Sequence, residues 1–174
     1  MKKLLVIAGV SALMSTSVFA DKNEVYMDQI GFGNDFASSQ QGSANTLNSL
    51  QEGIKNKASL TQKGNTNAAF NEQFGIANSL TSKQSGAINE VDSYQKGGFN
   101  EAELAQTGSS NYIEVNQVGY DNHTVGIQIG SSNHAYSLQK GFGNSLSYKQ
   151  SGNHDSLDAY QKGAHNTAAI RQSN

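Results

Sequence analysis

The side chains best placed to do chemistry in this sequence are amides that recur at a fixed spacing. A Gln occurs every eleven residues without a break. A side-chain amide both donates and accepts hydrogen bonds, so identical amides stacked along an axis can form a continuous ladder. We therefore predict a structural Gln ladder, which consists of Gln29, Gln40, Gln51, Gln62, Gln73, Gln84, Gln95, Gln106, Gln117, Gln128, Gln139, Gln150, Gln161 and Gln172.

Asn and Gly keep the same spacing. The predicted Asn ladder consists of Asn23, Asn34, Asn45, Asn56, Asn67, Asn78, Asn89, Asn100, Asn111, Asn122, Asn133, Asn144 and Asn166, and Asp155 replaces one member. The predicted turn glycines are Gly31, Gly42, Gly53, Gly64, Gly75, Gly86, Gly97, Gly108, Gly119, Gly130, Gly141, Gly152 and Gly163. A plainer interpretation of the Asn and Gln rows is that they only mark polar turn edges, as both residues do in many loops.

Other reactive side chains do not form a recognisable site. His123 and His134 occupy the same position in successive units, as do His154 and His165, but no Cys or paired carboxylate completes a ligand set. No Ser, His and Asp arrangement stands out from the repeat, and no helix follows the glycines to make a phosphate cradle. We therefore expect no catalytic residue, no cofactor and no metal.

The spacing indicates the elements that must hold these amides. Each unit has Asn at position one, an apolar residue at position three and Gln at position seven, followed by an x-Gly-x-x turn. Odd positions share one face of a strand, so Asn, the apolar residue and Gln would point inward together. Position three is apolar except at Thr124, and Gly126 interrupts position five. Consecutive strands would fold back so that position three faces position five, as for Phe36 and Ser49.

Fourteen such units account for residues 21–174 and leave none for a second domain. Two strands per layer predict an all-β, amyloid-like β-solenoid of about seven layers. An eleven-residue period also occurs in right-handed helical coiled coils. The Gly in nearly every unit and the abundance of Asn and Ser argue against helix.

The first twenty residues have the layout of a secretory signal peptide. Lys2 and Lys3 precede the mostly apolar residues 4–14, and Val18-Phe19-Ala20 is a small-x-small cleavage site. We predict cleavage after Ala20, which leaves a repeat domain of residues 21–174. That domain would carry ten basic and fourteen acidic residues, so it has no basic face for nucleic acid. Its lack of Cys excludes stabilisation by disulfides.

The repeat resembles that of the curlins, the subunits of bacterial curli. The segment Gln62-Lys63-Gly64-Asn65-Thr66-Asn67-Ala68-Ala69-Phe70-Asn71-Glu72-Gln73 shows the pattern, which continues through residues 21–174. The resemblance implies a structural subunit of extracellular fibres that support adhesion and the biofilm matrix. It also implies export through the periplasm to the cell surface. The implied partners are further copies of the chain, the other curli subunit, the outer-membrane export pore and periplasmic accessory proteins.

Two alternatives to a major fibre subunit stay open. One is the minor, nucleating curli subunit, which we favour less because the repeats run through nearly the whole chain. The other is a monomeric β-solenoid that binds a surface, which would need a regular outward row of identical residues. Position two instead varies, since it runs Glu24, Asp35, Thr46, Lys57, Ala68 and Ser79.

Overall fold

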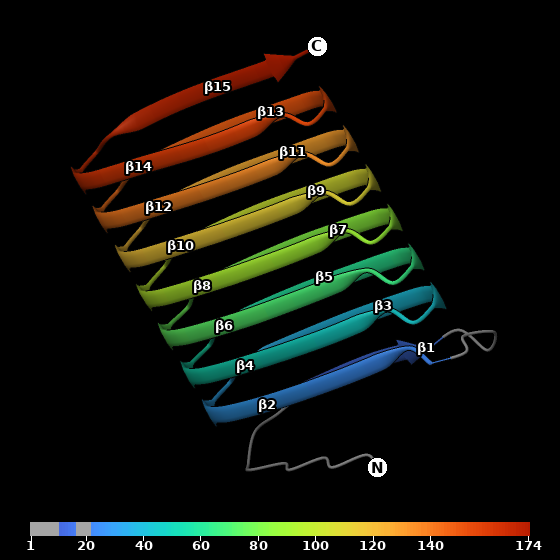
Figure 1. The fold of residues 1–174 in the computed structure, drawn as a ribbon. Helices are drawn as coiled ribbons and strands as arrows, with labels where there is room; N and C mark the ends of the chain where they lie inside the picture. Colours follow the sequence, from blue (N-terminus) through green and yellow to red (C-terminus); the bar gives the residue numbers. More distant parts are fainter. Residues whose placement is uncertain (1–10, 17–21) are drawn as a thin grey trace.

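The computed structural model describes residues 11–16 and 22–174. They form two parallel β-sheets that lie face to face, with the chain passing from one sheet to the other at every turn (Figure 1). The strands of one sheet run opposite to those of the other. The predicted fold class is confirmed, because the fourteen strands β2 to β15 build an all-β solenoid of about seven layers.

The strands alternate between the sheets along the chain. The eight-stranded sheet contains β1 (Ser11–Thr16), β3 (Asp35–Ser43), β5 (Lys57–Asn65), β7 (Ser79–Ala87), β9 (Glu101–Ser109), β11 (His123–Ser131), β13 (Ser145–Asn153) and β15 (Thr167–Ser173). The seven-stranded sheet contains β2 (Glu24–Phe32), β4 (Thr46–Ile54), β6 (Ala68–Ile76), β8 (Glu90–Gly98), β10 (Tyr112–Tyr120), β12 (His134–Phe142) and β14 (Ser156–Ala164). From β2 onward, each strand pairs with the strand 22 residues away, which places Gln over Gln and Gly over Gly.

The strands are longer than the sequence predicted. Strands β2 to β14 each span nine residues, from the residue after Asn to the residue after Gly. The predicted four-residue turn is therefore wrong, because its first three residues continue the strand and only two residues separate consecutive strands. Gly97, for example, stays in parallel register with Gly75 and Gly119 instead of leaving the sheet.

Two residues in each unit bend the backbone. The turn glycines have φ between 111° and 149°, a range that other residues resist. A second bend lies just before each Asn, where non-Gly residues such as Lys55, Thr66 and Ile88 have φ of 57° to 58° in the left-handed region. The sequence did not predict this second bend, because its position is filled by charged, polar, aliphatic and aromatic residues and has no signature.

The turn glycines are also required by the spacing of the layers. A Cβ added to Gly86 would collide with the carbonyl oxygen of Gly108 in the next layer, and the other stacked glycines repeat this contact. Backbone therefore lies directly against backbone along both glycine rows, and no larger residue fits there.

The core is a thin layer between the two sheets. Position three supplies most of its apolar members, of which Phe36, Leu80 and Ile113 are completely buried, and position five adds Leu60 and Tyr148. The Gln side chains at position seven reach the start of the facing strands: the Gln117 Nε2 donates to the carbonyl oxygens of Asn122 and Glu101, at positions one and two, and to the hydroxyl of Thr124 at position three. The predicted facing of positions three and five, as for Phe36 and Ser49, stays a prediction.

One aromatic side chain enters the core at a gap in the repeat. Tyr148 lies next to Gly126 in the parallel register of β11 and β13, and a Cβ on Gly126 would collide with the tyrosine ring and hydroxyl. The missing side chain of Gly126 therefore makes room for Tyr148. The Tyr148 hydroxyl is buried without a hydrogen-bond partner, and this burial raises its pKa.

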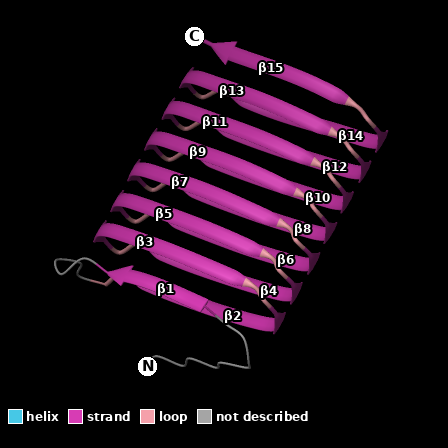
Figure 2. Ribbon diagram, turned by 180° about the vertical axis from the view of Figure 1, so that it is seen from behind, coloured by secondary structure: helices cyan, strands magenta, loops and turns pink. Residues whose placement is uncertain are grey.

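The predicted signal peptide lies mainly outside the described residues, which omit 1–10 and 17–21. Its described part, β1, pairs in parallel with β3 from Ser11 opposite Asp35 to Thr16 opposite Gln40. Figure 2 shows this strand at one end of the eight-stranded sheet and β15 at the other. The described part of the chain contains no helix long and apolar enough to cross a membrane.

Candidate functional site

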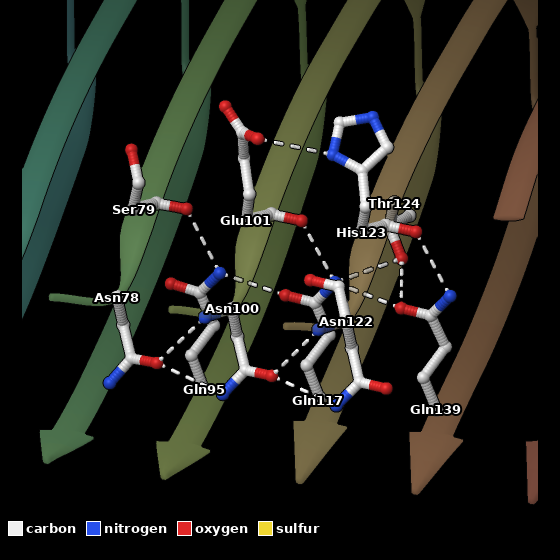
Figure 3. Close-up of polar contacts among 10 residues, drawn as sticks. All are labelled: Asn78, Ser79, Gln95, Asn100, Glu101, Gln117, Asn122, His123, Thr124 and Gln139. Atoms are coloured by element: carbon white, nitrogen blue, oxygen red, sulfur yellow. Dashed lines mark hydrogen bonds and ion pairs between the residues drawn. The ribbon is translucent and has the colours of Figure 1, made fainter. Parts of the chain in front are cut away.

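All fourteen residues of the predicted Gln ladder lie at the inward position seven, where the register of the sheets stacks them in two rows. Each Gln from Gln29 to Gln150 donates from Nε2 to Oε1 of the Gln in the next layer of its own sheet. The Nε2–Oε1 distance ranges from 2.5 Å for Gln29 and Gln51 to 3.1 Å for Gln84 and Gln106. Figure 3 shows Gln95, Gln117 and Gln139 in one such row, with distances of 2.8 and 2.9 Å.

The same amides also link the two sheets. The Gln95 Nε2 donates to the carbonyl oxygen of Ser79 at 2.9 Å, and the Gln117 Nε2 donates to that of Glu101 at 2.8 Å. This cross-sheet bond recurs from Gln40 to Gln172, always to the residue sixteen positions earlier. From Gln40 to Gln150, each Nε2 thus donates both along the axis and across the core. The sequence pattern indicates only the first of these contacts, because the second depends on how the sheets face each other.

The Asn residues form two rows at the turns, and their hydrogen bonds run the other way along the axis. The Asn100 Nδ2 and backbone N–H both donate to the Asn78 Oδ1 in the preceding layer, at 2.9 and 3.2 Å. The Asn100 Nδ2 also donates to the carbonyl oxygen of Gly119 at 3.0 Å. The Asn rows thereby connect neighbouring layers of both sheets, and they tie the turn glycines into the same network.

Thr124 is the polar exception at position three, and its neighbours explain it. Its hydroxyl donates to the Gln139 Oε1 at 2.9 Å and accepts from the Gln117 Nε2 at 3.3 Å (Figure 3). It therefore bridges two members of a Gln row from the opposite sheet. An apolar residue at this position would pack but could not make either bond.

Asp155 is the member that interrupts the Asn rows. Its backbone N–H donates to the Asn133 Oδ1 at 3.0 Å, as in the other units. A carboxylate has no N–H to donate, and the Asp155 Oδ2 is buried without a hydrogen-bond partner. Asp155 lies between β13 and β14, in the last turn but one. The hydrogen bonds between Asn residues in the earlier layers are therefore unaffected.

The histidines do not converge on a site. The His123 Nδ1 lies 3.3 Å from a carboxylate oxygen of Glu101. The His134 ring stacks on Tyr112 and the His165 ring meets the edge of Phe142. Among residues 11–16 and 22–174, no group of three or more His, Cys, Asp or Glu side chains could hold a metal ion.

Carboxylates gather on the outer surface of the seven-stranded sheet. Asp92 lies beside Glu114 in the register of β8 and β10. Burial raises the Asp92 pKa, and the negative charges of Glu114, Glu90 and Glu72 raise it further. The Tyr112 hydroxyl hydrogen-bonds to Glu114 at 3.2 Å. Burial, then the charge and hydrogen bond of Glu114, raise the Tyr112 pKa.

The fold and its amide rows thus define a repetitive β-solenoid whose regular spacing serves structure. Comparison with known proteins finds a match over one stretch of the chain. Residues 89–119 match the family described as the curlin associated repeat. The matched stretch contains β8, β9 and most of β10, including the amides of Gln95, Gln106 and Gln117. No curated protein matches the chain.

Proposed function

We propose that the chain is a structural subunit of extracellular curli-type amyloid fibres, which grow as copies add end to end. The match of residues 89–119 to the curlin associated repeat supports this proposal. The observation that carries it is the opposite polarity of the two kinds of amide row, because that polarity makes the two ends of the solenoid complementary. The proposal assigns no catalytic role to any residue.

The Gln row of the seven-stranded sheet ends in an acceptor at one end and a donor at the other. At the N-terminal end, the Gln29 Oε1 is buried and accepts no hydrogen bond. At the C-terminal end, the Gln161 Nε2 donates to the Ser145 carbonyl, and no described Gln lies in the layer beyond it. Its second N–H is therefore directed to the place where the Gln29 of a further copy would lie.

The Asn rows end with the opposite polarity. Asn166 donates to the Asn144 Oδ1 in the layer below, which leaves its own Oδ1 towards the C-terminal end. A copy added there would bring the backbone N–H and Nδ2 of its Asn34 to this oxygen. Only a head-to-tail contact matches donors with acceptors in both kinds of row, whereas a head-to-head contact would set Gln oxygen against Gln oxygen.

The sheet edges are compatible with the same contact. Among the described strands, β1, β2, β14 and β15 each pair on one side only. In a head-to-tail stack, β14 of one copy would pair with β2 of the next and β15 with β3, once β1 is removed. Two such pairs would add on the order of ten hydrogen bonds, each worth roughly 0.5 to 1.5 kcal/mol net, which is sufficient for stable growth.

The proposal includes export and processing. Residues 1–20 would act as a signal peptide that is cleaved after Ala20, and residues 21–174 would pass through the periplasm and the outer-membrane pore to the cell surface. Self-assembly into fibres that support adhesion and biofilm would follow there. A major subunit is favoured because Gln-bearing strands continue from β2 to β15. The alternative is a nucleating subunit, whose main effect would be on polymerisation of the other curli subunit.

The test begins with residues 21–174 diluted from denaturant and followed by thioflavin fluorescence and fibre diffraction. We expect fibres with a strand-spacing reflection at about 4.8 Å. Gln150→Ala should slow growth, because it leaves the Gln128 Nε2 and the Gln172 Oε1 without their ladder partner. Gln41→Ala, at an exposed position of β3, is the matched control and should grow as the parent does. A stable monomer without the reflection would contradict the proposal.

A further inference from the structure

The two outer surfaces of the solenoid have different compositions. Their residues occupy positions two, four, six and eight of each unit, which alternate with the buried positions. On the seven-stranded sheet these positions include seven aromatic residues: Tyr26, Phe70, Phe74, Tyr94, Tyr112, Tyr136 and Tyr160. On strands β3 to β15 of the other sheet the same positions hold no Tyr or Phe and are mainly Ser, Thr, Ala and Lys.

The charges of the two surfaces are opposite. The outer positions of the seven-stranded sheet, here called the acidic face, carry eight carboxylates and three lysines: Glu24, Asp28, Glu52, Glu72, Glu90, Asp92, Glu114 and Asp158 against Lys96, Lys140 and Lys162. The outer positions of β3 to β15, here called the basic face, carry five cations and three carboxylates: Lys57, Lys63, Lys83, Lys149 and Arg171 against Asp35, Glu101 and Glu103. Two acidic faces would repel each other, and so would two basic faces.

The strand directions decide which rows would meet if the basic face of one copy lay on the acidic face of another. Strands of the two sheets run in opposite directions (Figure 1), and within one copy the Gln117 amide at position seven bonds to positions one, two and three of the facing strands. Position six of one sheet therefore lies near positions two to four of the other across the width of the solenoid. A second copy with the same axis direction would set position six of the basic face near the outward positions two and four of the acidic face.

These rows are chemically complementary. Position six of the basic face carries Lys83, Lys149 and Arg171, all exposed. Position four of the acidic face carries three carboxylates and three aromatic rings: Asp92, Glu114, Asp158, Tyr26, Phe70 and Tyr136. Carboxylates pair with ammonium and guanidinium groups, and the faces of aromatic rings also attract cations.

We propose that the basic face of one copy packs on the acidic face of a second copy, so that parallel fibres associate side by side. This inference rests on the proposed function, since it requires fibres in which every copy points the same way. Seven layers and the width of one strand give a face of about 33 Å by about 25 Å, or roughly 800 Å² on each copy, which is the size of a standard specific interface. Because the two faces differ, the contact does not close on itself, and it produces bundles rather than pairs.

The test measures bundle width separately from fibre growth. In the triple variant Lys83→Glu, Lys149→Glu and Arg171→Glu, the cation row of the basic face becomes acidic. Lys149 and Arg171 are neighbours in the sheet. Two like charges therefore lie side by side within one copy in both the parent and the triple variant. We expect growth with the thioflavin response and the 4.8 Å spacing retained, while electron micrographs show bundles reduced to single fibres.

Two further variants distinguish a specific contact from a general effect of charge. Reversal of the opposing row by Asp92→Lys, Glu114→Lys and Asp158→Lys in the same chain should restore bundles. The control Lys22→Glu with Lys55→Glu changes charges in turns, outside both faces, and should keep the parental bundle width. High salt should also separate the parental bundles into fibres, since it screens exposed charges.

The outcomes separate this inference from the proposed function. Bundles that persist in the triple variant, or parental fibres that never associate laterally, would overturn the face-to-face contact and leave fibre formation intact. A triple variant that loses bundles without recovery in the charge-swapped chain would also overturn it. Failure of the parental chain to form any fibre would instead overturn the proposed function.

Discussion

Gly126 and Tyr148 act as a pair. The glycine lies at an inward position of β11, and the space above its Cα is filled by the tyrosine of β13. From the sequence, Gly126 was only an interruption of the repeat, because a missing side chain does not reveal what replaces it. The reason for the glycine is the neighbour one layer away, and that neighbour lies 22 residues further along the chain.

We predict that Gly126→Ala destabilises the fibre by about 1 to 3 kcal/mol, the usual cost of overpacking a core. Each 1.4 kcal/mol corresponds to about a tenfold rise in the concentration of soluble chain at equilibrium with fibres. That concentration can be measured after centrifugation. Adding Tyr148→Leu should recover part of the loss by removing the ring. Ser93→Ala, also at an inward position five, is the control, and no recovery in the double variant would contradict the paired role.

The buried amides themselves allow a test that depends on pH. In Gln95→Glu, a carboxylate would face the Gln117 Oε1 and the Ser79 carbonyl, both of which now accept from Gln95. We predict that this variant does not assemble at neutral pH but does so in acid, where the protonated carboxyl group regains one donor. Gln41→Glu at an exposed site is the control for added charge. Equal assembly of both variants at neutral pH would indicate that the Gln rows are dispensable.

At the scale of strands and turns, the sequence predicted the period, the two strands per layer and the inward face correctly. Each of these follows from the alternation of side chains and the recurrence of Gln95 and its counterparts. The predicted strand ends were wrong because Gly97 was expected to leave the sheet. Gly97 has a positive φ but stays in register with the glycines of the layers above and below. The bend before Asn89, at Ile88, could not be predicted, since its conformation is imposed by the strands on either side.

Strand β8 also carries a group whose titration should affect stability. Burial, and then Glu114, Glu90 and Glu72, raise the pKa of Asp92 above its ordinary value in the folded state. The folded state therefore holds this proton more tightly than the unfolded chain does, and the stabilisation is complete below the unfolded pKa. We predict that fibre stability falls as pH rises through the folded pKa of Asp92.

The measurement is the soluble concentration at equilibrium with fibres as a function of pH. Asp92→Asn should flatten the dependence in this range, because the titrating group is gone. Glu103→Gln removes one carboxylate from the opposite sheet and serves as the control. An unchanged pH profile in Asp92→Asn would contradict the assignment to this cluster.

For the whole molecule, the predicted signal peptide of residues 1–20, here called the leader, competes with the growing end for one edge. Strand β1 pairs with β3, which is the edge that β15 of an adjoining copy would occupy in a fibre. We predict that a chain that retains its leader can dock through its C-terminal end but then blocks further growth at its own N-terminal end. Small amounts of such chain, mixed with residues 21–174, should stop elongation at one of the two ends of seeded fibres observed by microscopy.

A substitution in β1 tests whether its pairing with β3, rather than the mere presence of the extra residues, blocks growth. Leu13→Pro removes a backbone N–H and places a ring within β1, so it should weaken pairing with β3 and restore growth at both ends. If the leader-bearing chain elongates fibres as fast as residues 21–174 do, β1 does not protect the edge.

Each strand pairs with the strand two units, or 22 residues, away. This pairing limits how the number of repeat units can change through mutation. Loss or duplication of two successive units removes or adds one layer, and every remaining strand keeps its sheet, its Gln row and its outer surface. Loss of a single unit would preserve the amides but would move each downstream strand to the opposite sheet. Tyr136 and Tyr160 would then lie on the basic face, among its lysines and serines. Heritable changes in length are therefore expected to accumulate in pairs of repeats.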